Sequence, residues 1–511
     1  MRAVFIALRN RQSLWLGAAA AGACLALASC GAGPAYKRPA VQTPPAYKEN
    51  VPAGNDQWKT ADPSDGVLRG NWWEMFDDPQ LNKLEQMVTV SNQNVKQAEA
   101  SFREARSLVA LNKANYFPSL GAQPSITSSF ASSNAGPQRP GGGSVTSLLS
   151  MPFSVSWEPN FWGRLSLASA NATANAQASA ADLENMKLSM QAELASDYFQ
   201  MEAIDMEQKL LKDTIGAYEK ALQLTTVRFN NGVASKADVA QAQAQLASTR
   251  AQLTDLGVSR AQLEHAIAVL TGQPPSTFSL PAGEIRSAPP KIPAGLPSQL
   301  LERRPDIAAS ERLVAAANAQ IGLAKVAFYP TLSLAANGGA EGSSFANWLT
   351  WPSRFWSLGP NMAATLLDFG RRKAGEQQAG AAYDATVASY RQTVLGAFQE
   401  VEDNLAALRL LAEEAVQQDD AVRAADESLR LEMDRYKGGT ASYLDVITSQ
   451  TIALTNERAA VQILGRRMTA SVQLIAALGG GWDASQLPSD QALRAAAKGK
   501  SAGGTTAQAL K

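Results

Sequence analysis

Residues 151–158 read Met-Pro-Phe-Ser-Val-Ser-Trp-Glu, and apolar side chains in this run alternate with polar or small ones. A period of two places the apolar side chains on one face of a β-strand and the polar ones on the other. Three further runs share the alternation, at 119–130, 331–337 and 356–366. Their lengths are comparable to the roughly 9–11 residues that a tilted strand needs to cross a bilayer. The pattern predicts four strands with one lipid-facing and one water-facing side.

A soluble sandwich with one wetted face is the alternative for these strands. Aromatic residues near the strand ends favour the membrane interpretation, because they form a girdle at membrane interfaces. They are Phe130, Phe153, Trp157, Trp348, Trp351, Phe355 and Trp356. A sheet in lipid can have no open edge, and four strands are too few to close a barrel. Several chains must therefore combine, and three of them would supply twelve strands.

The alternating runs belong to a pattern that occurs twice along the chain. Tyr116-Phe117-Pro118-Ser119-Leu120 is similar to Phe328-Tyr329-Pro330-Thr331-Leu332. Three landmarks recur 207 residues later, namely Gly163 as Gly370, Gly232 as Gly439, and Asp238 as Asp445. Each copy predicts a helix, a strand, a loop, a strand, a long helix, a tip and a second long helix.

These patterns divide the chain into six parts. We expect a signal peptide (1–29), a lipidated and weakly structured N-terminal arm (30–78), a first repeat (79–271), a Pro/Gly-rich connector (272–302), a second repeat (303–481) and a disordered tail (482–511). The loops between strands are predicted at 131–150 and 338–354.

Each copy also contains a stretch that predicts a helix of unusual length. No proline occurs from Leu165 to Arg228, and the stretch is rich in Ala, Gln, Leu and Glu, which favour helices. The second copy matches it over 371–435. About 64 residues at 1.5 Å each would span roughly 100 Å, which indicates coiled-coil packing. Such helices could surround a continuous bore, and a rod without a bore is the alternative.

Composition and charge argue against several other functions. The 511 residues include 46 Lys+Arg and 46 Asp+Glu, so the basic excess of a nucleic-acid-binding protein is missing. His265 is the single histidine, and we find no phosphate-binding glycine loop or nucleophile elbow. We predict that the chain is not an enzyme and has neither a catalytic nor a metal site.

The N-terminus has the pattern of a secreted lipoprotein. Three arginines precede an apolar stretch from Leu14 to Leu27, which is too short for a spanning helix. Leu27-Ala28-Ser29-Cys30 looks like a bacterial lipobox, so we expect cleavage before Cys30 and acylation of its thiol. No cofactor other than this covalent lipid is expected. An ordinary signal peptide with an incidental cysteine is the alternative.

Several ordered motifs together resemble the TolC family of outer-membrane efflux factors, in its OprM/NodT-type lipoprotein branch. They are Cys30, Trp72-Trp73, Phe117-Pro118, Phe161-Trp162-Gly163-Arg164, Arg303-Arg304-Pro305-Asp306-Ile307, Asp368-Phe369-Gly370-Arg371 and Tyr436 with Gly439. The resemblance covers nearly the whole mature chain up to about Trp482.

The resemblance implies a mostly α-helical homotrimer in the Gram-negative outer membrane. A twelve-stranded barrel, four strands from each chain, would be continued by a long periplasmic α-helical barrel. The implied partners are a periplasmic adaptor (membrane fusion) protein and an inner-membrane RND-type transporter. The implied function is the passive, gated exit duct of a tripartite efflux pump for small molecules such as drugs. A type I protein secretion duct and a lipid-tethered periplasmic coiled-coil scaffold are the alternatives.

The resemblance also assigns functional residues to the two tips. It implies a periplasmic gate formed by Asp445, Tyr436 and Asp238, with Asp445 in an acidic ring. The adaptor-contact residues would be Gly232, Val233, Ala234, Gly439, Thr440 and Ala441. Thr448 and Ala441 stand where some members have a second aspartate and a gate arginine. Both aspartates also fit an S-x-x-D helix cap, so a purely structural role is the alternative.

We predict that Cys30→Ala prevents acylation, because the thiol that carries the lipid is absent. The variant should accumulate as soluble or misplaced precursor, measured by membrane fractionation and mass spectrometry of the N-terminal peptide. Normal fractionation of an unacylated protein would contradict the predicted anchor.

Overall fold

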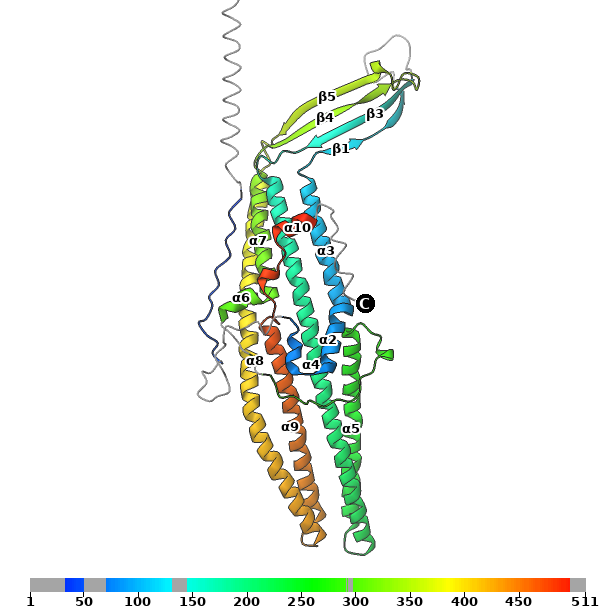
Figure 1. Cartoon of the computed structure of the whole chain (residues 1–511), viewed down its shortest axis with the longest axis vertical. Coiled ribbons are helices and arrows are strands. Elements are labelled where there is room, and N and C mark those ends of the chain that lie inside the picture. The colour runs from blue at the N-terminus through cyan, green and yellow to red at the C-terminus, as the bar shows by residue number, and fades with distance from the viewer. Residues whose placement is uncertain (1–32, 50–69, 131–144, 291, 293–296, 497–511) are drawn as a thin grey trace, which may run out of the picture.

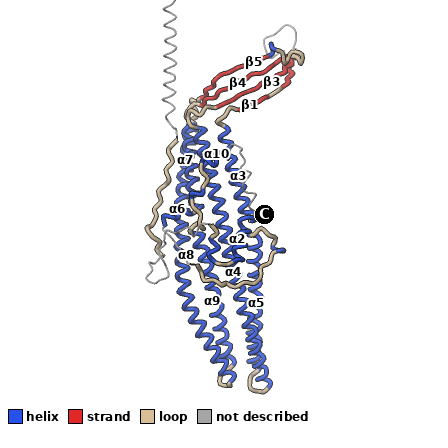
Figure 2. The backbone as a smooth tube through the Cα atoms, in the orientation of Figure 1, coloured by secondary structure: helices blue, strands red, loops and turns tan. Residues whose placement is uncertain are grey.

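The computed structural model describes residues 33–49, 70–130, 145–290, 292 and 297–496. The molecule is elongated and mostly helical, with the strands gathered at one end and the helices extending away from them (Figure 1, Figure 2). The predicted signal peptide and Cys30 lie outside the described residues. Among the helices that are described, none has the length and hydropathy required to cross a membrane.

The strands form one antiparallel sheet in the order β1-β3-β4-β5, with β2 also paired to β3. Their bounds are β1 Ser119–Ala122, β2 Ser125–Phe130, β3 Val145–Trp157, β4 Thr331–Gly342 and β5 Arg354–Ala363. β1 and β2 together occupy one predicted run, which is interrupted at Pro124 because proline cannot donate to a ladder. Gln123 N–H still donates to the Pro152 carbonyl at 3.1 Å, so both strands follow the same edge of β3.

The register gives the sheet two chemically different faces. Val155 is paired with Leu120 and Ala336, and Ala336 is paired with Leu358, so an apolar row crosses the sheet. The next row on the opposite face consists of Gly121, Ser154, Asn337 and Ser357. Leu120 and Leu358 are 72% and 73% exposed, so the described part of the chain leaves both ends of the apolar row uncovered.

Two strands extend further than the sequence predicts. β3 begins at Val145 and β4 continues to Gly342, inside the predicted loops 131–150 and 338–354. The additional residues are paired, since Val145 lies opposite Phe130 and Gly342 lies opposite Leu149. Serine and glycine in these segments weaken the apolar alternation by which a strand is recognised.

Four long helices make up most of the length of the molecule. They are α4 Arg164–Asn230, α5 Lys236–Leu270, α8 Arg371–Lys437 and α9 Tyr443–Ala477. α4 and α8 have 67 residues each, and α5 and α9 have 35 each. The two long helices expected from the missing prolines are confirmed. Gly163 and Gly370 precede them with φ of +78° and +91°, which allows the chain to turn from strand into helix.

Shorter helices pack around the part of the long helices nearer the sheet (Figure 1). They are α2 Pro79–Ser91, α3 Gln93–Ala114, α6 Leu300–Arg303, α7 Pro305–Val326 and α10 Asp490–Ala496. The main core lies where α2 and α4 meet the other helices. Phe76 is central to it, with its ring centroid 6.3 Å from that of Trp72 and 4.9 Å from that of Phe199.

Residues 33–49 differ from the weakly structured arm that the sequence predicts. They have no regular secondary structure, but they lie along α7 and α8 and are fixed there (Figure 1). The Tyr36 hydroxyl donates to the Glu311 carboxylate. Tyr47 is buried, and the two N–H groups that follow it donate to Glu402 at 2.7 and 3.0 Å.

The start of the predicted disordered tail is also ordered. Trp482 is 8% exposed and clusters with Ala308, while Leu493 on α10 is 2% exposed and clusters with Val109. Two large apolar side chains thus anchor residues 482–496, and Gln177 on α4 adds a hydrogen bond to the Pro488 carbonyl at 3.2 Å. The rest of the tail lies outside the described residues.

A buried arginine connects three helices near the core. Arg304 donates to Asp306 at 3.0 and 2.6 Å, to Glu400 on α8 at 2.6 Å, and to the Ala477 carbonyl at the end of α9 at 3.0 Å. Its side chain is 10% exposed. The arginine-proline-aspartate motif therefore fixes the start of α7 against both helices of the second long pair.

We predict that Arg304→Ala destabilises the protein by about 2 kcal/mol, because the buried Ala477 carbonyl and the partly buried Asp306 carboxylate lose a donor, whereas water can replace it at the exposed Glu400. Arg250→Ala is the control, since Arg250 forms an exposed pair with Glu219 and should cost less than about 1 kcal/mol. The measurement is the thermal unfolding midpoint in detergent. Equal shifts for the two variants would show that the connection adds little stability.

Candidate functional site

Both pairs of long helices turn at the end of the molecule farthest from the sheet (Figure 1). Gly232 and Gly439 follow α4 and α8 with φ of +75° and +80°, the left-handed region that ends helices. The N–H groups of Val233 and Thr440 each donate to the carbonyl five residues earlier, at 2.8 and 2.9 Å. The backbone thus presents the residues predicted to contact an adaptor at two protruding tips, namely Gly232, Val233, Ala234, Gly439, Thr440 and Ala441.

The two predicted gate aspartates cap the helices that leave these tips. Asp238 accepts from Ser235 N–H at 2.8 Å, and Asp445 accepts from Ser442 N–H at 2.9 Å. Each serine hydroxyl in turn accepts from the aspartate N–H, at 3.1 and 3.4 Å. Both are complete capping boxes, so the structural role predicted for the aspartates is present.

Capping does not remove Asp445 from solvent. Its side chain is exposed, and its Oδ2 atom also accepts from the Ser442 hydroxyl at 2.8 Å. This hydroxyl, the Ser442 N–H and the nearby Arg435 lower the pKa of the Asp445 carboxyl below its usual value. Asp445 is therefore an ionised, accessible carboxylate at neutral pH. Thr448, one turn further along α9, is exposed as well but adds no charge.

Just above the tips, α4, α5, α8 and α9 meet in a small apolar cluster, which we call the tip cluster. It consists of Ala221, Ala242, Tyr436, Tyr443 and Val446. The rings of Tyr436 and Tyr443 are 5.4 Å apart. The Tyr436 hydroxyl lies 3.2 Å from that of Thr225 on α4. The Tyr436 carbonyl accepts from Arg228 Nη1 at 2.5 Å, and the guanidinium carbon lies 4.5 Å from the ring centroid.

The structure brings the predicted gate residues near one another without pairing them directly. The Tyr436 hydroxyl interacts with Thr225, whereas the Asp238 carboxylate is occupied by Ser235. Asp238 lies close to Tyr443 instead. Burial, with contributions from Tyr436, Tyr218 and Asp238, raises the pKa of Tyr443 to about 12.

Sequence reasoning missed two residues of this site. Arg228 was detectable, because it occupies the place in the first copy that Arg435 occupies in the second. Thr225 gave no signal, since a threonine within a long helix is usually unremarkable. Its role becomes visible only when the ends of α4 and α8 are brought together in space, where the two hydroxyl groups are in contact.

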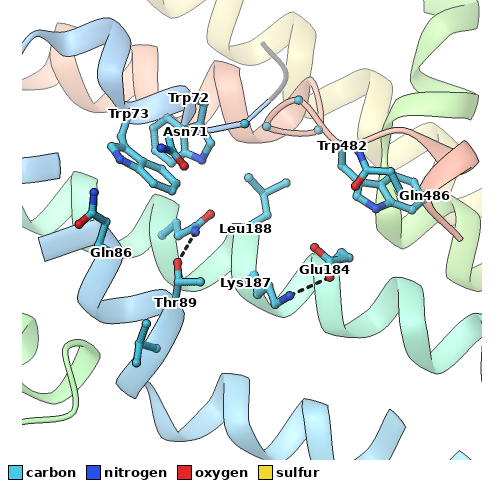
Figure 3. A pocket seen from close by; sticks show the side chains of 16 residues that line it. Asn71, Trp72, Trp73, Gln86, Thr89, Glu184, Lys187, Leu188, Trp482 and Gln486 are labelled. Carbon is cyan, nitrogen blue, oxygen red and sulfur yellow. Dashed lines mark hydrogen bonds and ion pairs between the residues drawn. The ribbon is translucent and has the colours of Figure 1, made fainter. Parts of the chain in front are cut away.

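Away from the tips, a concave region lies between α2, α4 and the glycine turn after α9 (Figure 3). The cavity has a volume of about 560 Å³ and is lined by Trp72, Trp73 and Trp482 among others. Its polar side chains bind one another: Lys187 donates to Glu184 at 2.8 Å, and Gln191 donates to Thr89 at 3.1 Å. No group of acidic, histidine or cysteine side chains able to hold a metal occurs among the residues described. The exposed, charged tips are therefore the better candidate site.

Comparison with known proteins assigns the chain to a protein family. The sequence matches the outer membrane efflux protein family over residues 84–273 and 296–480. The chain belongs to this family. Its location is therefore the outer membrane, and the resemblance found in the sequence is confirmed. The gap between the matched stretches lies within the predicted connector 272–302.

Relatives match the efflux protein over almost its full length. The pyoverdine export outer membrane protein OpmQ of Pseudomonas aeruginosa is 30% identical over 468 residues, which cover 90% of this chain and 96% of the relative. The cation efflux system protein CusC of Escherichia coli is 26% identical and covers 90% and 97%. Among solved structures, the outer-membrane channel OprN has a TM-score of 0.81 at 27% identity, covering 89% and 100%. The open state of the Neisseria gonorrhoeae MtrE channel has a TM-score of 0.76 at 26% identity, covering 88% and 98%.

We predict that Gly439→Ala destabilises the efflux protein by about 1–2 kcal/mol, because an alanine is strained at positive φ. A Cβ at this position would meet only ordinary contacts, so the cost comes from the backbone. Gly216→Ala is the control, because Gly216 lies within α4 in open space and the change should stabilise by about 0.5–1 kcal/mol. Thermal unfolding should move in opposite directions for the two variants. A shift in the same direction would contradict the role of the backbone.

Proposed function

We propose that the efflux protein is the exit duct of a tripartite pump for small molecules, working as a homotrimer with a periplasmic adaptor and an inner-membrane RND-type transporter. The two-faced sheet with uncovered apolar residues supports the membrane end of this duct. Family membership supports the export function. The chain itself would supply a passive path and no catalytic chemistry.

The sheet edges support assembly from several chains. Among the residues that the structure describes, the order β1-β3-β4-β5 leaves the outer edges of β1, β2 and β5 without a neighbouring strand. Lipid cannot satisfy bare N–H and C=O groups, so these edges must pair with other chains. A trimer would join β5 of each chain to β1 and β2 of the next and close a twelve-stranded barrel.

The helices support a tube that continues this barrel through the periplasm. An internal two-fold repeat accounts for the equal lengths of α4 and α8 and of α5 and α9. The start of α4 is lined by buried alanines, which let neighbouring helices approach closely. They are Ala172, Ala174, Ala176, Ala178, Ala180 and Ala181. Three chains would place twelve long helices around one bore.

The N-terminal arm supports a lipid anchor on Cys30. Gly33 lies against Gly322 near the end of α7 and against Leu167 in the first turn of α4. Both contacts lie within about one helical turn of the helix ends that lead to the strands. Three residues of extended chain reach at most about 10 Å, so the Cys30 acyl groups would enter the membrane beside the base of the sheet. No other cofactor is proposed.

The tips support a gate and an adaptor contact at the periplasmic end. Asp445 is exposed and ionised, and three copies would form a ring of negative charge at the entrance. Tyr436 belongs to the contacts that join the two tips, and Asp238, which caps α5, would contribute to the gate through its position close to Tyr443. The residues from Gly232 and from Gly439 onward protrude far enough to meet a partner.

Two other functions are less well supported. A type I secretion duct shares this architecture, but the relatives named above are a pyoverdine export and a cation efflux protein, which favours small solutes. A lipid-tethered coiled-coil scaffold would need no sheet with an uncovered apolar face.

We predict that Asp445→Ala weakens block of single-channel current by divalent and trivalent cations at least tenfold, because the ring loses its carboxylates. The measurement is single-channel recording of the purified protein in planar bilayers. Glu427→Ala is the control, since Glu427 is an exposed carboxylate of α8 that pairs with Arg430 on the same helix. If the cation block is unchanged in Asp445→Ala, the gate assignment is wrong. If the purified wild-type protein conducts no ions in the bilayer, the proposed duct function is wrong.

A further inference from the structure

Basic side chains gather where the second repeat changes between helix and strand. α7 leads into β4 and β5 leads into α8, and both connections lie at the base of the sheet (Figure 1). Arg371, Arg372 and Lys373 are the first three residues of α8, and Lys325 belongs to the last turn of α7. We call these four residues the basic junction. All four cations lie within about one helical turn of the connections to the strands.

Two carboxylates neutralise part of the basic junction. Asp368 pairs with Arg372 at 2.6 Å, and Glu376 pairs with Lys373 at 2.9 Å. Lys325 shares the second carboxylate, since the hydrogen bond from Lys373 and the charges of Lys373 and Lys325 lower the pKa of Glu376. Four cations therefore meet two carboxylates, which leaves an excess of two positive charges among the described residues of the junction.

In the first repeat the equivalent arginine is neutralised within the chain. Arg164 corresponds to Arg371, and its guanidinium donates two bonds of 2.6 Å to Glu158. Thr365 stands in the second repeat at the position of Glu158. Among the residues that the structure describes, the side chain of Arg371 accordingly has no ion pair, and the residue is exposed. An exposed guanidinium without a carboxylate can bind an anion from outside the chain.

Exposed leucines lie between the end of β5 and the basic junction. Leu366 and Leu367 are 93% and 72% exposed, and they follow a strand whose Leu358 is exposed as well. Leucine partitions into hydrocarbon, whereas long basic side chains keep their charge in water or among headgroups. This order of side chains, from strand through leucine to arginine, is therefore the one expected where a chain leaves a bilayer.

We propose that the basic junction binds the headgroup of an anionic phospholipid, with Arg371 and Lys325 contacting its phosphate and Leu366 and Leu367 its acyl chains. This inference rests on the proposed membrane end of the duct. A guanidinium can donate two parallel hydrogen bonds to a phosphate, and an ammonium adds a point charge. A zwitterionic headgroup brings a cation of its own, so the positive excess favours a headgroup with net negative charge.

The N-terminal arm places the proposed lipid anchor at the same level. Gly33 lies against Gly322, which is three residues before Lys325 on α7. Acyl groups on Cys30 would therefore enter the membrane close to the basic junction, on the side of the sheet from which the helices extend. The occupant of the site is accordingly a phospholipid of that leaflet and not a lipid of the opposite membrane surface.

The test measures which phospholipid the full-length protein retains from mixed micelles that contain equal amounts of phosphatidylglycerol and phosphatidylcholine. The variant with Arg371→Gln and Lys325→Gln should lower the ratio of bound phosphatidylglycerol to phosphatidylcholine at least fivefold, because one basic residue at a charged lipid surface contributes about that factor. High salt should lower the ratio of the wild-type protein, because it screens the charges. Arg423→Gln is the matched control, since Arg423 is an exposed arginine of α8 that pairs with Asp420 and lies roughly 80 Å from Arg371 along the helix.

The outcomes distinguish the lipid site from its alternatives. A fall in the ratio for the double variant beyond that for Arg423→Gln supports the site, and equal ratios in the two variants overturn it. If the double variant dissociates into single chains in native electrophoresis while its lipid ratio is unchanged, the cations bind a neighbouring chain and the proposal is wrong. Displacement of phosphatidylglycerol by inorganic phosphate at equal concentration would mean that the ligand is a free anion, which also overturns it.

Conductance separates this inference from the proposed function. A wild-type protein that selects phosphatidylglycerol but conducts no ions in planar bilayers would contradict the duct and leave the lipid site in place. A protein that conducts but shows no lipid preference would contradict the lipid site alone. Thermal unfolding midpoints of the double variant and of Arg423→Gln would show that both variants fold.

Discussion

A β-strand whose outer edge faces lipid leaves backbone N–H and C=O groups without partners, and each such group costs several kcal/mol. This constraint limits how the strands can be arranged in a membrane more strongly than any single side chain does. Within the described residues of one chain, the ends of the apolar row are exposed and the outer edges of β1, β2 and β5 have no neighbouring strand. This supports the proposed assembly of the sheet from several chains.

Away from the sheet the same groups are satisfied locally. Each long helix pairs its own backbone, so the structure can extend roughly 100 Å from the strands without further sheet. Gly163 and Gly370 lie where the backbone changes from pairing between strands to pairing within a helix. Both have a positive φ, in the left-handed region. The helices then need only side-chain contacts to stay together. Near the tips, the described polar contacts between the two hairpins, α4 with α5 and α8 with α9, are those that Thr225 and Arg228 make with Tyr436.

Much of the fold was predictable, because it depends on patterns of local sequence. Apolar alternation located the strand runs, and the absence of proline located α4 and α8. The prediction failed where a single residue overrides its surroundings. Pro124 divides one strand, and Trp482 orders a segment of otherwise disordered composition. Among the site residues, the capping role of Asp445 followed from its S-x-x-D motif, but the partners of Tyr436 depend on which helix ends meet in space. Position along one helix does not contain that information.

The first described residue of the arm has a consequence for how the protein is mounted in its membrane. Gly33 lies against Gly322 and Leu167. A Cβ added to either glycine would lie only 2.8 Å from a methyl carbon of Leu167. The arm is therefore held against the helical wall at Gly33, its first described residue. In the proposed trimer, three lipids attached through such arms would anchor the tube at three points around its axis and would oppose its tilting in the membrane.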